Sequence, residues 1–68
     1  MDDVRRRLAS NLRRLRREKH LSQEAFAGEV GIHRTYISDL ERGARNPTIE
    51  VVDRLARALG VKIGALLD

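Results

Sequence analysis

The spacing of apolar residues predicts that the first segment of the chain is a helix. Apolar side chains recur there at steps of four, four and three residues: Val4, Leu8, Leu12 and Leu15. A helix advances about 100° per residue, so this spacing aligns the four side chains along one side. Arginines fill many of the other positions, and Arg16 lies at the edge of the apolar stripe. No segment alternates apolar and polar residues as a half-buried strand does.

Two short helices are predicted next, close together in the sequence. Ser22 is a favourable N-cap for the first, and Gly31 suits the left-handed conformation that ends a helix. The second is expected from residue 33 or 34 to Arg42, before Gly43. The inward-facing residues of the pair are apolar: Phe26, Ala27, Val30, Ile37 and Leu40. Because so few residues connect the two helices, and because the small Ala27 permits a close crossing, the pair is typical of a helix-turn-helix.

A fourth helix is expected to begin after Thr48 and to end at Gly60. Thr48 is a favourable N-cap, and Pro47 precedes it, where the missing backbone N–H costs no hydrogen bond. The apolar residues of this helix repeat with helical spacing: Val51, Val52, Leu55, Ala56 and Leu59. In residues 61–68 we expect a short fifth helix, although Gly64 disfavours a helix by about 1 kcal/mol relative to alanine. The predicted fold is all-α, a single five-helix domain over residues 1–68.

The third predicted helix has two different faces. Viewed down its axis, polar side chains span roughly 140° of its circumference: Arg34, Thr35, Ser38, Asp39 and Arg42. Ile37 and Leu40 lie on the opposite side. An α-helix fits the major groove of B-DNA, where short polar and cationic side chains can match the hydrogen-bonding edges of the bases. The pattern therefore favours DNA recognition by this helix.

The positive charge of the chain is concentrated at its start. The net charge is +4; residues 1–20 carry eight basic and three acidic residues, net +5, and residues 21–68 carry six basic and seven acidic residues, net −1. A basic segment fits a polyanionic partner, but the solvated face of an arginine-rich chain would carry the same charge. A core in a chain this short is expected to contribute only about 3–5 kcal/mol, so we expect a homodimer to supply further stability.

The composition also narrows the class of protein. With no cysteine, the chain forms neither a disulfide nor a thiolate metal site, and it fits the reducing cytoplasm. The sequence has no signal-peptide pattern and no run of roughly 18–20 apolar residues, so we expect a soluble protein without a membrane partner. His20 and His33 are too few and too far apart to indicate a metal site, and no Ser/His/Asp set or phosphate-binding glycine loop occurs. We expect neither enzyme activity nor a cofactor.

Most of the chain resembles a known family of DNA-binding domains. The resemblance is carried by residues 21–61, LSQEAFAGEVGIHRTYISDLERGARNPTIEVVDRLARALGV. This segment is similar to the Cro and phage-repressor type of helix-turn-helix domain, the lambda-repressor-like or XRE family, and within it to small regulators that control restriction-modification operons. The resemblance implies a transcriptional regulator that binds double-stranded DNA at an inverted-repeat operator as a homodimer, with the third helix in the major groove.

The resemblance also implies roles for individual side chains. Gln23 matches a glutamine that binds a DNA phosphate at the start of the second helix. The positions that reach base edges are Arg34, Thr35, Ser38 and Asp39. The positions that bind the phosphate backbone after the third helix are Arg42, Arg45 and Asn46. Arg16 and Glu41 match a pair that the family often uses as an internal salt bridge between the first and third helices.

Some positions depart from the family pattern or allow two interpretations. His33 replaces the usual serine or threonine N-cap, so we expect a looser or shifted start of the third helix. Tyr36 is expected to pack beside the core rather than to contact DNA. Asp39 is either a solvated residue or one that needs a cytosine amino group or a neighbouring arginine. Lys62 and Gly64 depart from the usual capped fifth helix, which leaves the details of the dimer contact open.

The tail is the segment in which we predict a dimer interface. Its apolar residues are more numerous than a terminal turn is expected to bury: Val61, Ile63, Leu66 and Leu67. We therefore expect Ile63 and Leu66 to extend into a two-fold interface with residues of the fourth helix.

Two other functions fit parts of the sequence. The chain could be an antitoxin-like module whose main partner is another protein. Its arginine-rich first helix could instead bind anionic lipid as an amphipathic anchor. The apolar stripe of that helix has no Trp or Phe and is needed for the core, which disfavours the lipid alternative.

Overall fold

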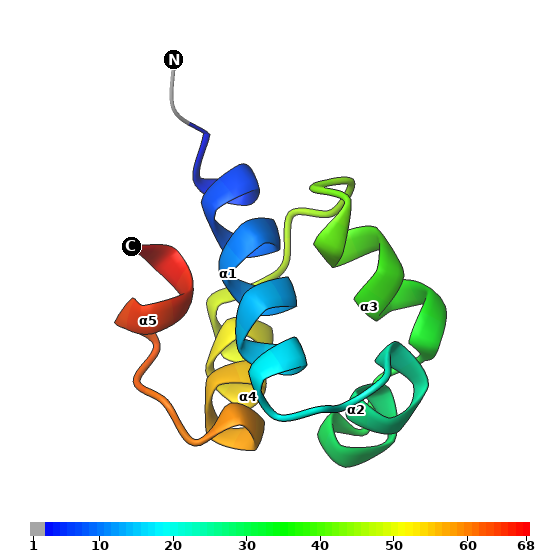
Figure 1. Ribbon diagram of the computed structural model, residues 1–68. Coiled ribbons are helices and arrows are strands. Elements are labelled where there is room, and N and C mark those ends of the chain that lie inside the picture. Colours follow the sequence, from blue (N-terminus) through cyan, green and yellow to red (C-terminus); the bar gives the residue numbers. More distant parts are fainter. Residues whose placement is uncertain (1–2) are drawn as a thin grey trace.

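The computed structural model describes residues 3–68 and contains five helices. They are α1 (Val4–Glu18), α2 (Gln23–Val30), α3 (Arg34–Glu41), α4 (Ile49–Leu59) and α5 (Gly64–Leu67). The described residues include no β-strand, so the predicted all-α, five-helix fold is confirmed. Figure 1 shows α1 between α5 on one side and α3 on the other. α1 contacts both of these helices, whereas α2 packs against α3 and α4.

The ends of several helices follow from side chains close in the sequence. Ser22 Oγ accepts the backbone N–H of Ala25 at 3.0 Å, and Thr48 Oγ1 accepts that of Val51 at 3.2 Å. Both predicted N-caps are therefore confirmed. Gly31 ends α2 in the left-handed conformation, at φ +79°, which glycine adopts without steric cost.

His33 caps α3 with its imidazole ring. Its Nδ1 accepts the backbone N–H of Thr35 at 3.1 Å, and the helix begins at Arg34. The expectation of a looser or shifted start is wrong, because a ring nitrogen that carries no proton provides the same acceptor as a serine hydroxyl. At its other end α3 stops at Glu41, with Arg42 as C-cap, one residue earlier than expected.

The core draws on all five helices. Its largest fully buried side chains are Leu12, Phe26, Ile37, Leu40, Leu55 and Leu66. Burial of each such side chain contributes roughly 1.5–3 kcal/mol relative to leaving it exposed. Val4 is 46 % exposed and lies outside this core, although it belongs to the predicted apolar stripe of α1. Because Ile37 and Leu40 are both in the core, the orientation of α3 is set by the packing of the whole chain.

The tail folds back onto α1, which corrects one predicted site. Leu66 has 0 % of its surface exposed, so it cannot lie in a dimer interface and that prediction is wrong. Arg7 Nε donates to Leu67 O at 2.9 Å, and Asn11 Nδ2 donates to Leu66 O at 3.0 Å. These side chains satisfy carbonyl groups of the last turn, which lack partners within α5. α1 therefore provides the surface against which a single terminal turn can bury Leu66. Ile63 is half-buried.

Candidate nucleic-acid interface

A buried ion pair joins α1 to the end of α3. Arg16 donates to both carboxylate oxygens of Glu41, from Nε at 2.6 Å and from Nη2 at 2.9 Å. Its Nη1 also donates to Leu21 O at 2.6 Å. The side chains of Arg16 and Glu41 are 9 % and 3 % exposed. A planar guanidinium suits this bidentate geometry, which a lysine could not reproduce. The pair therefore fixes α3 relative to α1.

The same carboxylate holds Gln23 at the start of α2. Gln23 Nε2 donates to Glu41 Oε1 at 3.1 Å. Burial disfavours the charged form of Glu41, but hydrogen bonds from Arg16 and Gln23 outweigh this effect, so the pKa of Glu41 is lowered. The hydrogen bonds to Glu41 also raise the pKa of Arg16. Gln23 is thus held at a helix N-terminus, where backbone N–H groups can also bind an anion.

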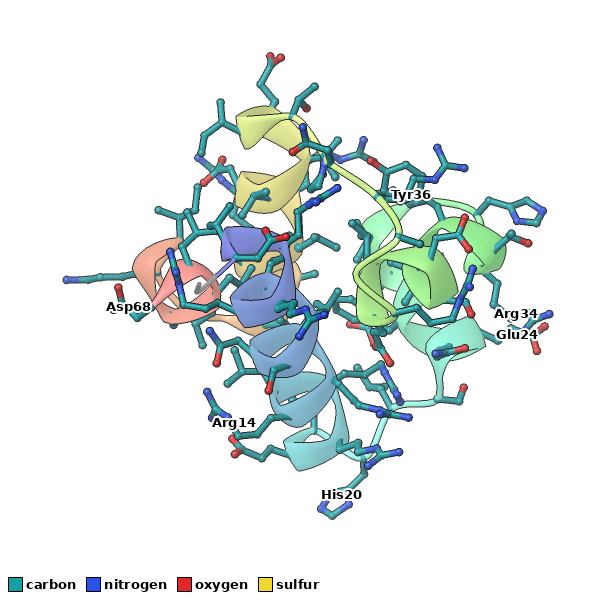
Figure 2. The ribbon with its side chains drawn as sticks, turned by 90° about the horizontal axis from the view of Figure 1, so that it is seen from above. Arg14, His20, Glu24, Arg34, Tyr36 and Asp68 are labelled. Carbon is teal, nitrogen blue, oxygen red and sulfur yellow. The ribbon has the colours of Figure 1, made fainter. Side chains whose placement is uncertain are left out.

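The exposed face of α3 includes part of the predicted base-reading set. Arg34 and Thr35 are exposed, and Figure 2 shows Arg34 extending away from the rest of the molecule, on the same side as Glu24 of α2. Ser38 and Asp39 are half-buried. Ile37 on the opposite side has 0 % of its surface exposed. The polar and apolar faces of α3 therefore agree with the helical periodicity of the sequence.

Asp39 binds two arginines where α3 ends. Its carboxylate accepts hydrogen bonds from Arg42 Nη2 and from Arg45 Nε, the latter at 3.3 Å. The hydrogen bond from Arg42 is the main reason that the pKa of Asp39 is lowered; desolvation opposes this shift and Arg45 adds to it. A neighbouring arginine was one of the partners that the sequence left open for Asp39, and the chain provides two.

Tyr36 restrains one of these two arginines. The guanidinium carbon of Arg45 lies 4.8 Å from the centre of the Tyr36 ring, a distance typical of a cation–π contact. Tyr36 is half-buried and packs against the core, so the packing predicted for it is confirmed. Arg45 is therefore held by a ring and a carboxylate just where the chain leaves α3, and Asn46 follows it as an exposed residue.

Arg54, which sequence reasoning missed, holds the turn between α2 and α3. Its Nη2 donates to Val30 O at 2.7 Å and to Gly31 O at 3.4 Å. A cation at the C-terminus of a helix also interacts favourably with the helix dipole. A Cβ at Gly31 would lie 3.3 Å from the same nitrogen, so glycine leaves room for the arginine. No sequence signal pointed to this contact, because 24 residues separate Arg54 from Val30.

Two other kinds of feature are absent from residues 3–68. No group of three or more His, Cys, Asp or Glu side chains there could hold a metal ion. None of the helices in this range combines the length and the apolar character needed to cross a membrane.

Comparison with known proteins places this arrangement in a family. Residues 12–66 match the model of the family described as helix-turn-helix. The chain belongs to the helix-turn-helix family. It is 41 % identical over 68 residues to the control protein C.BamHI of Bacillus amyloliquefaciens, across 98 % of this chain and 84 % of that protein. It is 51 % identical over 59 residues to an uncharacterized HTH-type transcriptional regulator of Sinorhizobium fredii, across 87 % of this chain and 77 % of that protein.

Solved structures of helix-turn-helix proteins have the same fold. The hypothetical transcription factor NHTF from Neisseria matches with a TM-score of 0.94 and 41 % identity, over 97 % of this chain and 76 % of that one. The restriction-modification controller protein C.AhdI from Aeromonas hydrophila matches with a TM-score of 0.87 and 37 % identity, over 91 % of this chain and 94 % of that one. The predicted resemblance to this family and to control proteins is confirmed. The chain is thus a transcriptional regulator of the helix-turn-helix type.

Proposed function

We propose that this helix-turn-helix regulator binds an inverted-repeat operator in double-stranded DNA as a homodimer, with α3 of each copy in the major groove. The observation that carries the proposal is the division of α3 into two faces. Arg34 and Thr35 are exposed, whereas Ile37 and Leu40 anchor the opposite face in the core. An α-helix presented in this way can enter the major groove without disturbing the fold. A chain without cysteine also suits action in the reducing cytoplasm.

Arg34 is the principal base-reading residue of this proposal. It lies in the first turn of α3, and its guanidinium can donate to guanine O6 and N7 together, the commonest specific contact in the major groove. The methyl group of Thr35 can contact a thymine methyl, and the hydroxyl of Ser38 can donate or accept. Asp39 has a different role in the proposal. A cytosine amino group would have to compete with two arginines for its carboxylate, so we assign Asp39 to positioning those arginines.

The remaining predicted residues flank α3 on both sides and suit phosphate contacts. Gln23 lies at the N-terminus of α2, next to the buried ion pair. Arg42, Arg45 and Asn46 are exposed where α3 ends and the following loop begins. In a complex these groups would bind the two strands that border the major groove and so fix the register of α3 without reading sequence.

An apolar groove is the surface that we propose for dimerisation in place of Leu66. The groove has a volume of about 260 Å³, and its lining includes Val4 and Ile49, which are 46 % and 64 % exposed. Asn46 and Pro47 of the loop after α3 also line it. A two-fold axis at this groove would bring the loops of the two copies close together. Both copies of α3 would then face the same side of the DNA, which is the arrangement needed to contact two half-sites about 34 Å apart. Ile63, the half-buried residue before α5, does not line this groove and remains a separate candidate for the dimer interface.

Selection of binding sites from random-sequence duplexes tests the proposed DNA recognition. We expect an inverted repeat to be enriched, with a guanine in each half-site about 10 bp from its mate. Arg34→Ala should then weaken binding by about 1–3 kcal/mol per half-site and relax the preference at that guanine only. Arg57→Ala, which removes an exposed arginine from α4, is the control and should leave the preference unchanged.

One result would contradict this function, and another would contradict the role of Arg34. If no sequence is enriched, recognition of an operator is excluded, and the protein-binding alternative gains support. If Arg34→Ala weakens binding to all sequences equally, Arg34 contacts phosphate and base reading falls to Thr35 and Ser38.

Sedimentation analysis tests the proposed dimer surface. Ile49→Lys should yield folded monomers, because it places a charge in an apolar contact, whereas Glu29→Lys on the exposed surface of α2 should leave the dimer intact. A folded Ile49→Lys variant that stays dimeric would exclude this groove.

A further inference from the structure

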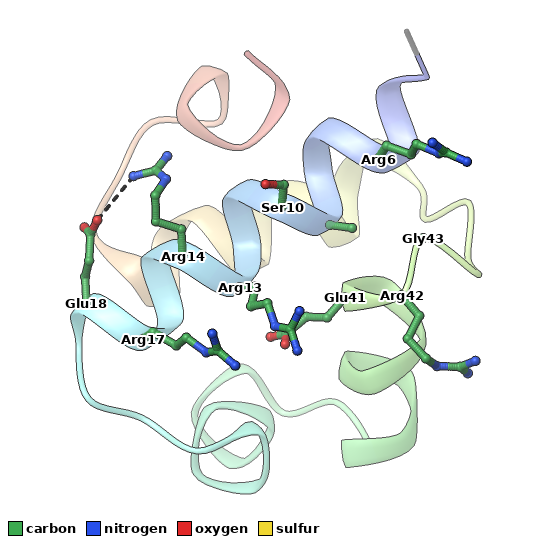
Figure 3. Close-up of a pocket in the computed structure, with 10 residues that line it drawn as sticks. Arg6, Ser10, Arg13, Arg14, Arg17, Glu18, Glu41, Arg42 and Gly43 are labelled. Carbon is green, nitrogen blue, oxygen red and sulfur yellow. Dashed lines mark hydrogen bonds and ion pairs between the residues drawn. The ribbon is translucent and has the colours of Figure 1, made fainter. Parts of the chain in front are cut away.

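A groove lined by arginines runs between α1 and the end of α3. Its volume is about 690 Å³, and five arginines line it: Arg6, Arg13, Arg14, Arg17 and Arg42. Figure 3 shows Arg13 and Arg17 projecting from α1 toward the side on which α2 and α3 lie. Arg14, in contrast, projects toward Glu18 and pairs with it at 3.3 Å. The open side of the groove is therefore strongly cationic.

Three of these arginines form a single row along α1. Arg6, Arg13 and Arg17 are separated by seven and four residues, so they lie within about 20° of one direction around the helix. The row extends for about 16 Å, at roughly 1.5 Å per residue. It lies opposite the buried Leu8 and Leu12, so all three guanidinium groups are available at the surface.

The carboxylates that line the groove do not neutralise the two ends of the row, Arg6 and Arg17. Glu18 is paired with Arg14, and Glu41 is paired with the buried Arg16. Arg6 and Arg17 make no side-chain hydrogen bond or ion pair with any other residue of the described range 3–68. Two such unpaired guanidinium groups, one at each end of the row, are suited to a ligand with several negative charges.

The groove is continuous with the candidate interface on α3. Glu41 and Arg42 line the groove, and Glu41 is also the partner of Gln23 at the start of α2. A DNA duplex with α3 in its major groove would therefore pass one strand beside the mouth of the groove.

We propose that this groove binds the phosphodiester backbone of DNA, with Arg6 and Arg17 each making a phosphate contact that does not depend on sequence. The proposal rests on the proposed function and extends the DNA-binding surface from α3 and its loop onto α1. An arginine fork binds phosphate in bidentate fashion, and each phosphate contact releases counterions. The row would therefore contribute affinity and salt dependence, while the choice of operator stays with α3.

The test compares two double variants that lose the same charge. Arg6→Gln/Arg17→Gln, the row variant, removes the two unpaired arginines at the ends of the row. Lys19→Gln/Arg57→Gln, the control variant, removes two exposed positive charges that do not line the groove. All four residues are exposed, so both variants should fold, which circular dichroism checks. The dissociation constants of the selected operator and of a random-sequence duplex are measured between about 50 and 200 mM salt.

We expect the row variant to flatten the salt dependence of binding. A dimer would lose four phosphate contacts, so the slope of log Kd against log salt should decrease by about 3.6. The affinity lost between 50 and 200 mM salt would then be about 150-fold smaller than for the wild type. The control variant should keep the wild-type slope. The ratio of operator to random-duplex affinity should be the same in all three proteins.

The outcomes separate this proposal from the proposed function. If the wild type binds its operator but the two variants have equal slopes, the groove does not bind DNA and this proposal alone fails. If the wild type binds no duplex, both proposals fail. A titration of the wild type with inorganic pyrophosphate, followed by NMR, tests whether the groove is a site for small anions rather than for DNA. The assignment to DNA would be overturned if pyrophosphate changed the NMR chemical shifts of Arg6 and Arg17 while the row variant kept the wild-type salt dependence of DNA binding.

Discussion

Breaking the buried pair between Arg16 and Glu41 should destabilise the protein severely. Replacement of Arg16 by methionine removes two hydrogen bonds to Glu41, at 2.6 and 2.9 Å, and the hydrogen bond to Leu21 O. The side chain of Glu41 is 3 % exposed in the intact pair, and in the variant its carboxylate would keep only Gln23 as a direct partner. A carboxylate in that position must either be protonated or remain charged without compensation, and both are unfavourable.

The magnitude follows from the burial of the pair. Removal of one partner of a buried ion pair costs about 3–5 kcal/mol, well above the 0–1 kcal/mol typical of surface pairs. A domain of this length is expected to have a free energy of unfolding of only about 3–10 kcal/mol. Each kcal/mol shifts the melting temperature of such a small domain by roughly 4–8 °C, so the single variants should melt at least about 12 °C below the wild type.

A double-mutant cycle with Glu41→Met isolates the interaction. The double variant should lose less stability than the sum of the losses in the two single variants, because no unpaired charge remains buried. Gln23 and Leu21 O each lose a hydrogen-bond partner in the double variant, which offsets part of this gain. Stability is measured by urea unfolding, followed by circular dichroism. Trimethylamine N-oxide in the buffer stabilises the folded state, so that the single variants are folded at the start of the titration. Single losses that add to the double loss within about 0.5 kcal/mol would refute the interaction.

The stability of the chain should also depend on pH, on one helical glycine and on the tail. The pKa values of Glu41 and Asp39 are lowered in the folded state. The stability from their charges is therefore fully present above the ordinary values, 4.5 and 3.8, and is lost as the pH falls through the lower folded-state values. Urea titrations should therefore show a smaller acid loss in Glu41→Gln than in the wild type; equal losses would contradict this. A Cβ at Gly28 meets nothing within 4 Å, so Gly28→Ala should raise the free energy of unfolding by about 0.5–1 kcal/mol in thermal melts, and a lower melting temperature would count against an unstrained helix there. Leu66→Ala should cost about 2–5 kcal/mol in urea unfolding, whereas a loss near zero would mean that Leu66 is not in the core.

Local patterns in the sequence were sufficient to predict the helices and the two faces of α3. Ser22 and Thr48 each cap a backbone N–H three residues away, so residue type and spacing alone set that geometry. The faces of α3 follow from the 3.6-residue period, which places Ile37 and Leu40 on one side. His33 was misjudged because its capping ability depends on which ring nitrogen accepts, a property that the residue type leaves open.

Contacts between distant residues were decided only by the tertiary structure. Leu66 is buried because α5 returns to α1, where Asn11, 55 residues earlier, binds its carbonyl oxygen. Two other sets of contacts likewise depend on how segments meet in space. Arg45 contacts Tyr36 and Asp39, and Arg54 donates to a carbonyl group at the end of α2. Helical periodicity determines which face of each helix is apolar, but the positions at which those faces meet depend on the packing of all five helices together.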